Sequence, residues 1–151
     1  MKNYIITGNK GYIKSYDYNN NKIYHKYFDK DQEQGNCLSI IIKIDNNIIK
    51  IINSCTNGYI RIWNFHSGNL LKRINVGDKL YGICSWNNDY LFVGFIDHSI
   101  KLIDLKEGKI IKELNGHYQE VTAIQKISHP KYGECLISHG CDSIILWNGK
   151  V

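Results

Sequence analysis

The sequence predicts an all-β protein built from four similar units of three or four strands. Short runs rich in Ile, Val, Tyr, Phe and Trp are bounded by Gly, Asn and Asp at intervals of about 8 to 12 residues, as in chains made of short strands. No segment keeps the apolar period of a helix. A seven-residue segment also recurs four times along the 151 residues, which chance does not explain.

The recurring segment marks the third strand of each unit. It reads GYIKSYD at 11–17, GYIRIWN at 58–64, HSIKLID at 98–104 and DSIILWN at 142–148. Its first isoleucine serves as a landmark at Ile13, Ile60, Ile100 and Ile144, with spacings of 47, 40 and 44 residues. These spacings bracket the roughly 40 to 45 residues of a four-stranded propeller blade.

The first two units span residues 4–29 and 38–76. Unit one begins at its second strand, predicted over Tyr4–Gly8, and turns at Lys10-Gly11. Unit two turns at the equivalent Asn57-Gly58, a strong hairpin signal because both residue types tolerate positive φ. A second turn lies eight residues after the landmark in the first three units, at Asn21, Gly68 and Gly108.

The last two units span residues 80–115 and 117–151. Unit three is predicted to have strands over Leu80–Trp86, Tyr90–Phe95, Ser99–Leu105 and Lys109–Leu114. Unit four reaches only its third strand, which gives fourteen strands in all. The strands do not alternate cleanly between apolar and polar residues, as expected when both faces of a sheet pack against neighbours.

At these residues the chain resembles the WD40-repeat β-propeller family, over essentially its whole length. That family pairs Gly-His before the first strand of a blade with Trp-Asp at the end of the third. Unit four matches best, with Gly116-His117 ahead of Val121 and with Trp147-Asn148 at the end. The resemblance implies β-propeller blades, which the number of strands predicts to form an incomplete or open ring.

The resemblance also implies a buried hydrogen-bonded tetrad made of His117, Ser138, Asp142 and Trp147. A buried imidazole and a buried indole N–H each need a partner, and a carboxylate fixes the tautomer of the histidine. The turn of unit four is one residue shorter than that of unit three, so a displaced Asp142 is the alternative. Other units carry parts of the tetrad: Asn57 with Trp63 in unit two, and Asp97 without a Trp in unit three.

Composition favours a folded protein in a reducing compartment. The net charge is +5, but the lysines are spread along the chain, which favours a solvated surface over direct nucleic-acid binding. The five cysteines are odd in number and lie in apolar runs, where a free cysteine acts as a small hydrophobe. No signal peptide or membrane span is expected, and the predicted location is the cytoplasm, with the nucleus as alternative.

Neither a metal site, a cofactor site nor a catalytic site is predicted. His129, Cys135, His139 and Cys141 are potential zinc ligands, but no Cys-x-x-Cys pair accompanies them. Ser138, His139 and Asp142 are adjacent, but a propeller turn explains them and no Gly-x-Ser-x-Gly elbow is present.

The predicted function is therefore that of a non-catalytic scaffold for protein–protein interaction. Loops that enter the first strands would share one rim, which makes Lys79, Tyr118 and Glu120 candidate contacts. The alternatives are a subunit of an RNA- or chromatin-associated complex, or a fragment of a longer WD40 protein. Fourteen strands also predict an open arc that associates with itself or with a further propeller segment, or else a four-bladed ring.

Overall fold

The computed structural model describes residues 3–30 and 35–148 and contains fourteen antiparallel strands in four sheets. The predicted all-β class and the number of strands are confirmed. We call the sheets blades 1 to 4 in chain order. Blade 1 consists of β1 Tyr4–Asn9, β2 Tyr12–Asp17 and β3 Lys22–Tyr27. Blade 2 consists of β4 Cys37–Asp45, β5 Ile48–Cys55, β6 Tyr59–Asn64 and β7 Leu70–Asn75. Blade 3 consists of β8 Leu80–Ser85, β9 Tyr90–Phe95, β10 Ile100–Asp104 and β11 Lys109–Leu114. Blade 4 consists of β12 Val121–His129, β13 Gly133–Gly140 and β14 Ile144–Trp147.

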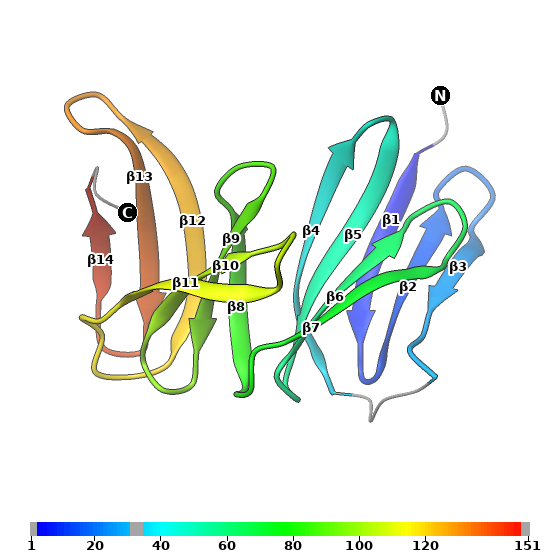
Figure 1. The fold of residues 1–151 in the computed structure, drawn as a ribbon. Coiled ribbons are helices and arrows are strands. Elements are labelled where there is room, and N and C mark those ends of the chain that lie inside the picture. The colour runs from blue at the N-terminus through cyan, green and yellow to red at the C-terminus, as the bar shows by residue number, and fades with distance from the viewer. Residues whose placement is uncertain (1–2, 31–34, 149–151) are drawn as a thin grey trace.

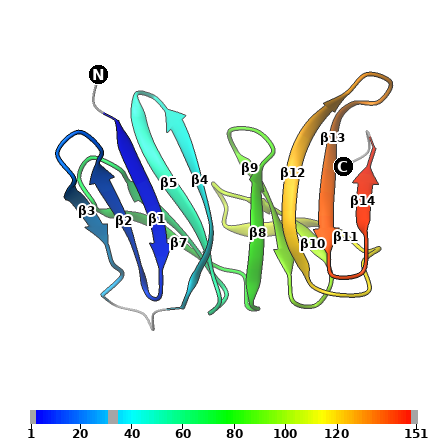
Figure 2. The same ribbon diagram turned by 180° about the vertical axis from the view of Figure 1, so that it is seen from behind.

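The blades stand side by side in chain order as an open arc, with β3 and β14 at opposite ends (Figures 1 and 2). Consecutive blades touch through their first and second strands: β1 lies against β4, β4 and β5 against β8, and β8 and β9 against β12. Within each blade the strands pair in sequence order, which short turns permit.

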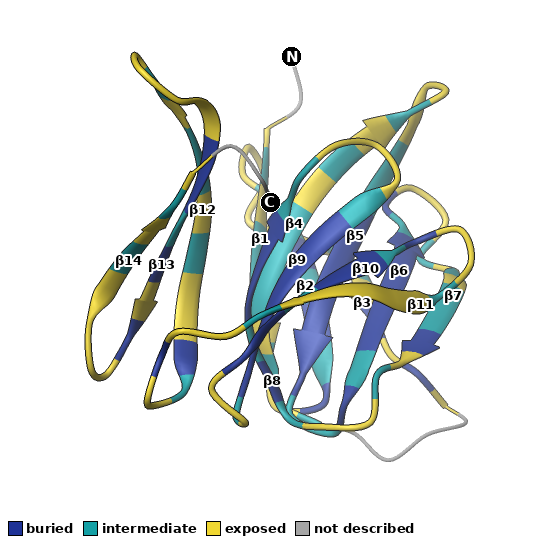
Figure 3. Cartoon of the chain, turned by 60° about the vertical axis from the view of Figure 1, so that its left-hand side comes forward, coloured by how far each residue is buried: buried dark blue, intermediate teal, exposed yellow. Residues whose placement is uncertain are grey.

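Each junction between blades has its own apolar core. Ile13, Tyr27, Ile51 and Trp63 fill the junction of blades 1 and 2. Eleven buried side chains, from Ile52 to Leu105, fill the next. The junction of blades 3 and 4 is built around residues such as Phe92 and Val121. Burial is therefore continuous through the middle of the arc and falls off toward blade 4 (Figure 3).

The predicted turns form for the expected backbone reason. Asn21, Gly68 and Gly108 have φ of 59°, 74° and 73°, a region that glycine and asparagine enter at low cost. Gly58 has φ of 81°, and His98 takes the equivalent place in blade 3 at 73°.

A buried ion cluster ties the end of blade 1 to blade 2. The carboxylate of Asp29 accepts hydrogen bonds from Nε of Arg61 at 2.8 Å and from Nε and Nη2 of Arg73 at 2.8 and 2.7 Å. Asp29 and Arg61 are almost fully buried, so removing one partner would leave a desolvated charge. The cluster therefore fixes the position of residue 29 against blade 2.

No helix that is long and apolar enough to cross a membrane occurs in the described residues.

Candidate functional site

The four side chains of the expected tetrad lie together in blade 4. Trp147 Nε1 is 2.8 Å from Ser138 Oγ, Ser138 Oγ is 2.7 Å from His117 Nε2, and His117 Nδ1 is 3.0 Å from Asp142 Oδ1. The shorter turn of this blade does not displace Asp142 from the histidine.

The chemistry of the four groups fixes the direction of each hydrogen bond. A carboxylate only accepts, so Nδ1 of His117 carries a proton and donates it to Asp142. The indole of Trp147 only donates, so Ser138 accepts from it, and Ser138 in turn donates its hydroxyl proton to Nε2 of His117 when the imidazole is neutral. The chain of donors therefore runs from Trp147 through Ser138 and His117 to Asp142.

The tetrad holds the loop that enters β12. Asp142 Oδ2 accepts a hydrogen bond from the backbone N–H of Tyr118 at 3.1 Å and another from the hydroxyl of Ser143 at 2.8 Å. Burial alone would raise the pKa of Asp142, but the hydrogen bonds from Tyr118, His117 and Ser143 outweigh it and hold the pKa well below its ordinary value. The carboxylate is thus a charged anchor between the turn 141–143 and the loop 116–120.

The residue at 140 has to be small for this geometry. A Cβ added to Gly140 would lie 2.4 Å from Asp142 Oδ1 and 2.8 Å from His117 Nδ1. A glycine here therefore leaves room for the histidine and the carboxylate to meet.

Blade 2 uses a different partner for its tryptophan. Trp63 Nε1 donates to Oδ1 of Asn53 at 2.9 Å, and Asn53 occupies the strand position that Ser138 occupies in blade 4. The amide of Asn53 in turn donates to Sγ of Cys55 at 3.0 Å. Asn57 stands four residues after Asn53, as Asp142 stands four after Ser138.

Blade 3 keeps only the turn residue. Asp97 accepts hydrogen bonds from the backbone N–H of Ser99 at 3.0 Å and from Lys101 Nζ at 2.7 Å. Val93 stands where Ser138 stands in blade 4, and Ile103 stands where Trp147 does. Asp97 therefore stabilises its own turn.

The three predicted contact residues lie on one rim, in loops that enter first strands. The side chain of Tyr118 is 85% exposed, although its backbone N–H is held by Asp142. Lys79 and Glu120 are half-buried, and Lys79 Nζ lies 5.2 Å from the centre of the Tyr81 ring. Of the three, Tyr118 is the one presented to solvent on a fixed backbone.

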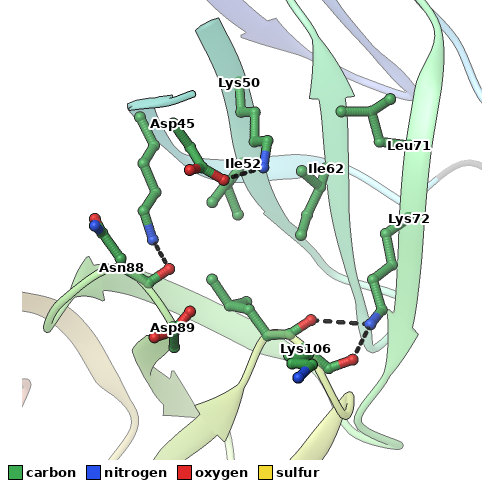
Figure 4. A pocket seen from close by; sticks show the side chains of 11 residues that line it. Asp45, Lys50, Ile52, Ile62, Leu71, Lys72, Asn88, Asp89 and Lys106 are labelled. Atoms are coloured by element: carbon green, nitrogen blue, oxygen red, sulfur yellow. Dashed lines mark hydrogen bonds and ion pairs between the residues drawn. The ribbon is translucent and has the colours of Figure 1, made fainter. Parts of the chain in front are cut away.

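The opposite rim carries a cavity that was not predicted, between blades 2 and 3 (Figure 4). It measures about 400 Å³. Lys43 Nζ donates to Asn87 O at 3.0 Å, Lys50 Nζ lies 2.6 Å from Asp45 Oδ2, and Lys72 Nζ donates to Leu105 O at 2.9 Å and to Lys106 O at 2.6 Å.

Two lysines of this cavity, Lys43 and Lys72, link blade 2 to blade 3. Lys43 and Lys72 leave blade 2 and bind loop carbonyls of blade 3, and burial lowers the pKa of Lys43. These lysines are distant in sequence and meet only because strand pairing places them at one edge.

The cysteines agree only in part with their predicted role. Cys55, Cys84 and Cys135 are buried and Cys37 is half-buried, but Cys141 is exposed, because it lies in the turn after β13 and not in a strand. The prediction that all five behave as core side chains is wrong for Cys141. Burial raises the pKa of the Cys37 thiol to about 12, which disfavours a reactive thiolate.

The suspected zinc ligands do not converge. His129 stacks on Tyr132 with ring centres 4.7 Å apart, and Thr122 Oγ1 lies 3.1 Å from Nδ1 of His139. Among residues 3–30 and 35–148 no three His, Cys, Asp or Glu side chains form a group that could hold a metal ion.

Two curated proteins resemble the chain at low identity, and no family model matches it. It is 26% identical over 120 residues to U3 small nucleolar RNA-associated protein 21 homolog of Schizosaccharomyces pombe, covering 79% of this chain and 13% of that protein. It is 24% identical over 95 residues to Autophagy-related protein 16 of Arabidopsis thaliana, covering 62% and 18%. The chain spans less than a fifth of the length of either relative.

Solved structures resemble the chain in fold. The computationally designed protein Ika4 superimposes with a TM-score of 0.72 at 20% identity, over 98% of this chain and 86% of that one. The designed protein Ika8 gives the same score and identity over 98% of this chain and 43% of its own.

Proposed function

We propose that this chain is a WD40-type propeller segment that acts as a non-catalytic scaffold for protein–protein interaction. The observation that carries the proposal is the loop 116–120. The tetrad fixes its backbone, and the ring of Tyr118 projects into solvent. A rigid, exposed aromatic side chain binds a partner at little cost in conformational entropy, and tyrosine is enriched among residues that dominate binding energy.

The surroundings of the charged groups support a structural role. Asp142 anchors a loop, Asp29 joins two arginines, and Lys43 joins two blades. Each of these groups is engaged by a partner that holds the fold together. The two relatives are named for a small nucleolar RNA and for autophagy, which supports a module used in different assemblies.

The cytoplasm is the proposed location, with the nucleus as alternative. Cys37 and Cys55 are direct partners across β4 and β5, and both thiols are free. Neighbouring free thiols favour a reducing compartment.

The test is affinity capture with quantitative mass spectrometry, comparing the wild-type chain with Tyr118→Ala. Tyr132→Ala is the matched control, because Tyr132 is an exposed tyrosine of the same blade on the opposite rim. We expect proteins that wild type and Tyr132→Ala retain but Tyr118→Ala loses by about tenfold or more, in line with the loss of one strong contact. Titration of a purified captured protein then establishes direct binding. Equal capture by all three chains would contradict the role of this rim.

The second candidate is a subunit of an RNA- or chromatin-associated complex, which the name of the fission yeast relative favours. Direct binding to RNA would weaken steeply as salt rises, because phosphate contacts release counterions. Nuclease treatment before capture separates the two candidates: protein-mediated capture survives it, whereas RNA-mediated capture is lost.

A further inference from the structure

Each blade is a sheet with two faces, and each face carries its own set of apolar side chains. We call the face turned toward the next blade in chain order the far face, and the other the near face. In blade 2 the far face carries Ile52, Ile60 and Ile62, which pack against blade 3 in one core. In blade 3 the same ladder positions are Phe92, Ile100 and Leu102, which pack against blade 4. These three side chains of blade 2 and three of blade 3 are all buried.

The far face of blade 4 keeps this apolar pattern without the cover. The equivalent residues are Ile137, Ile144 and Leu146, as the pairing of β13 with β14 shows. Ile144 is 67% exposed and Leu146 is 41% exposed. Blade 4 therefore exposes two of the three side chains that blades 2 and 3 bury at a junction and leaves the third, Ile137, half-buried.

The near face of blade 1 is the complementary uncovered surface. At the second-strand position where blades 2, 3 and 4 bury Ile51, Leu91 and Leu136 completely, blade 1 has Ile5, which is 48% exposed. Ile23 of β3, on the same face, is 54% exposed.

One position on the far face shows what kind of blade fits against blade 4. The partner of the landmark isoleucine is small in blades 1 to 3: Gly8, Ser54 and Gly94. The first strand of the next blade lies directly against this small residue. A Cβ on Gly94 would lie 2.2 Å from the carbonyl oxygen of Val121 in β12. Ser54 Oγ donates a hydrogen bond to the carbonyl oxygen of Tyr81 in β8 at 2.6 Å.

In blade 4 the same position is His139, the partner of Ile144. An imidazole here occupies the space that an incoming first strand takes at every other junction. Blade 1, as described, is a three-stranded sheet that starts with β1, the equivalent of a second strand. A blade of this form brings no first strand to that position, so it fits beside His139 where a four-stranded blade does not.

We propose that the far face of blade 4 binds the near face of blade 1 of a second copy of this chain, so that two copies close one ring through two identical head-to-tail junctions. The occupant is chosen by the apolar positions that the two end faces share with the internal junctions, and by His139. This inference does not use the rim that carries Tyr118.

The first test is the mass of the purified 151-residue chain in solution, by light scattering after size exclusion and by sedimentation, with a reductant present because Cys141 is exposed. We expect twice the 17.5 kDa of one chain. A monomer at micromolar concentration would overturn the proposal and would leave further blades of a longer chain as the occupant. A series of growing oligomers would overturn the closed ring.

The second test separates head-to-tail from symmetric contact. Ile144→Lys disrupts the far face of blade 4 and Ile5→Lys disrupts the near face of blade 1, so each variant alone is expected to be a monomer. Ile111→Lys is the matched control, because Ile111 is 50% exposed on the outermost strand β11 of blade 3, and it should stay dimeric. Circular dichroism identifies any variant that fails to fold.

Mixing the two monomeric variants gives the decisive result. Ile5→Lys retains an intact far face and Ile144→Lys retains an intact near face, so together they rebuild one junction and form a heterodimer. A dimer that Ile5→Lys leaves intact would mean that far face meets far face, and would refute the head-to-tail arrangement. If the chain is a dimer but no partner depends on Tyr118, the proposed scaffold function is contradicted and the dimer is not.

Discussion

Asp142 is a single side chain whose effect extends over a whole loop. It accepts a hydrogen bond from His117, from Ser143 and from the backbone of Tyr118, and so joins two segments that are 24 residues apart. Its charge is favoured over its neutral form in the folded state, since three donors face it. The stability of the chain must therefore depend on the protonation of this carboxylate.

The pH dependence of unfolding should show this dependence. The folded pKa of Asp142 lies below the ordinary value of 3.8, so in the acid range the unfolded chain takes up the proton first. The stabilisation is fully present above the ordinary value and is lost as pH falls through the folded pKa. In urea titrations, wild type should be more stable than Asp142→Asn at neutral pH, and this difference should shrink below pH 3.8.

A control for general acid effects is Glu107→Gln, an exposed carboxylate on the opposite rim. A difference between wild type and Asp142→Asn that stays constant down to about pH 2 would contradict the assigned role.

Trp63 fills the core between blades 1 and 2 and donates its N–H to Asn53. Trp63→Ala should lower the free energy of unfolding by about 3 to 5 kcal/mol, because a large buried side chain leaves a cavity. Trp63→Phe keeps much of the volume and should cost about 1 to 3 kcal/mol, through the lost hydrogen bond. Chemical denaturation measures both, with Tyr118→Ala expected within about 0.5 kcal/mol of wild type. A loss under about 1 kcal/mol for Trp63→Ala would place this ring outside the core.

Chelation should leave the chain unchanged. His129, Cys135, His139 and Cys141 have separate surroundings, with His129 stacked on Tyr132 and Cys135 buried. We expect the melting temperature with EDTA to equal that without it, because a structural metal would contribute folding free energy. Stoichiometric zinc by elemental analysis, lost together with the fold on chelation, would refute this.

The strands themselves were predictable because their signal is local. Landmark isoleucines, Asn57-Gly58 and the glycine turns depend on near neighbours in sequence, and β10 and β11 lie close to where the pattern placed them. The tetrad of blade 4 was predicted from the resemblance of unit four to the WD40-repeat family. Asn53 was not recognised, because an amide replaces the hydroxyl at that position, and the cavity lysines were not, because their meeting depends on register between distant strands.

Blade junctions limit which residues an element can carry. Gly94 of β9 has no room for a Cβ, since the carbonyl oxygen of Val121 in the next blade would lie 2.2 Å away. Gly94→Ala should therefore force β12 outward and destabilise the chain by about 1 to 3 kcal/mol, as overpacking does.

The matched control is Ser54→Ala, at the same ladder position of blade 2. Ser54 already carries a Cβ, so this change removes only the hydrogen bond to Tyr81 O and should cost about 1 kcal/mol. Thermal unfolding measures the stability of both variants. If Gly94→Ala lowers the free energy of unfolding less than Ser54→Ala does, the junction of blades 3 and 4 has room for the added Cβ and the prediction is wrong.

At the scale of the whole molecule, the arc buries its middle and leaves its ends uncovered. The cores at the three internal junctions contain fully buried apolar side chains, whereas Ile5 and Ile144 at the ends are 48% and 67% exposed. Repeat proteins depend on neighbours to bury what one unit cannot bury alone. The stability of this chain is therefore expected to depend on how many copies are present.

The melting temperature should rise with protein concentration if two copies close the ring. Folded chains that associate are removed from the unfolding equilibrium, so mass action stabilises them as concentration increases, for example from about 1 to 100 µM. Ile144→Lys removes the far face of blade 4 and should melt at one temperature over this range, while Ile111→Lys should follow wild type. Calorimetry measures all three. A wild-type melting temperature that does not change with concentration, in a chain that unfolds cooperatively, would mean that the four blades are stable with their end faces in water.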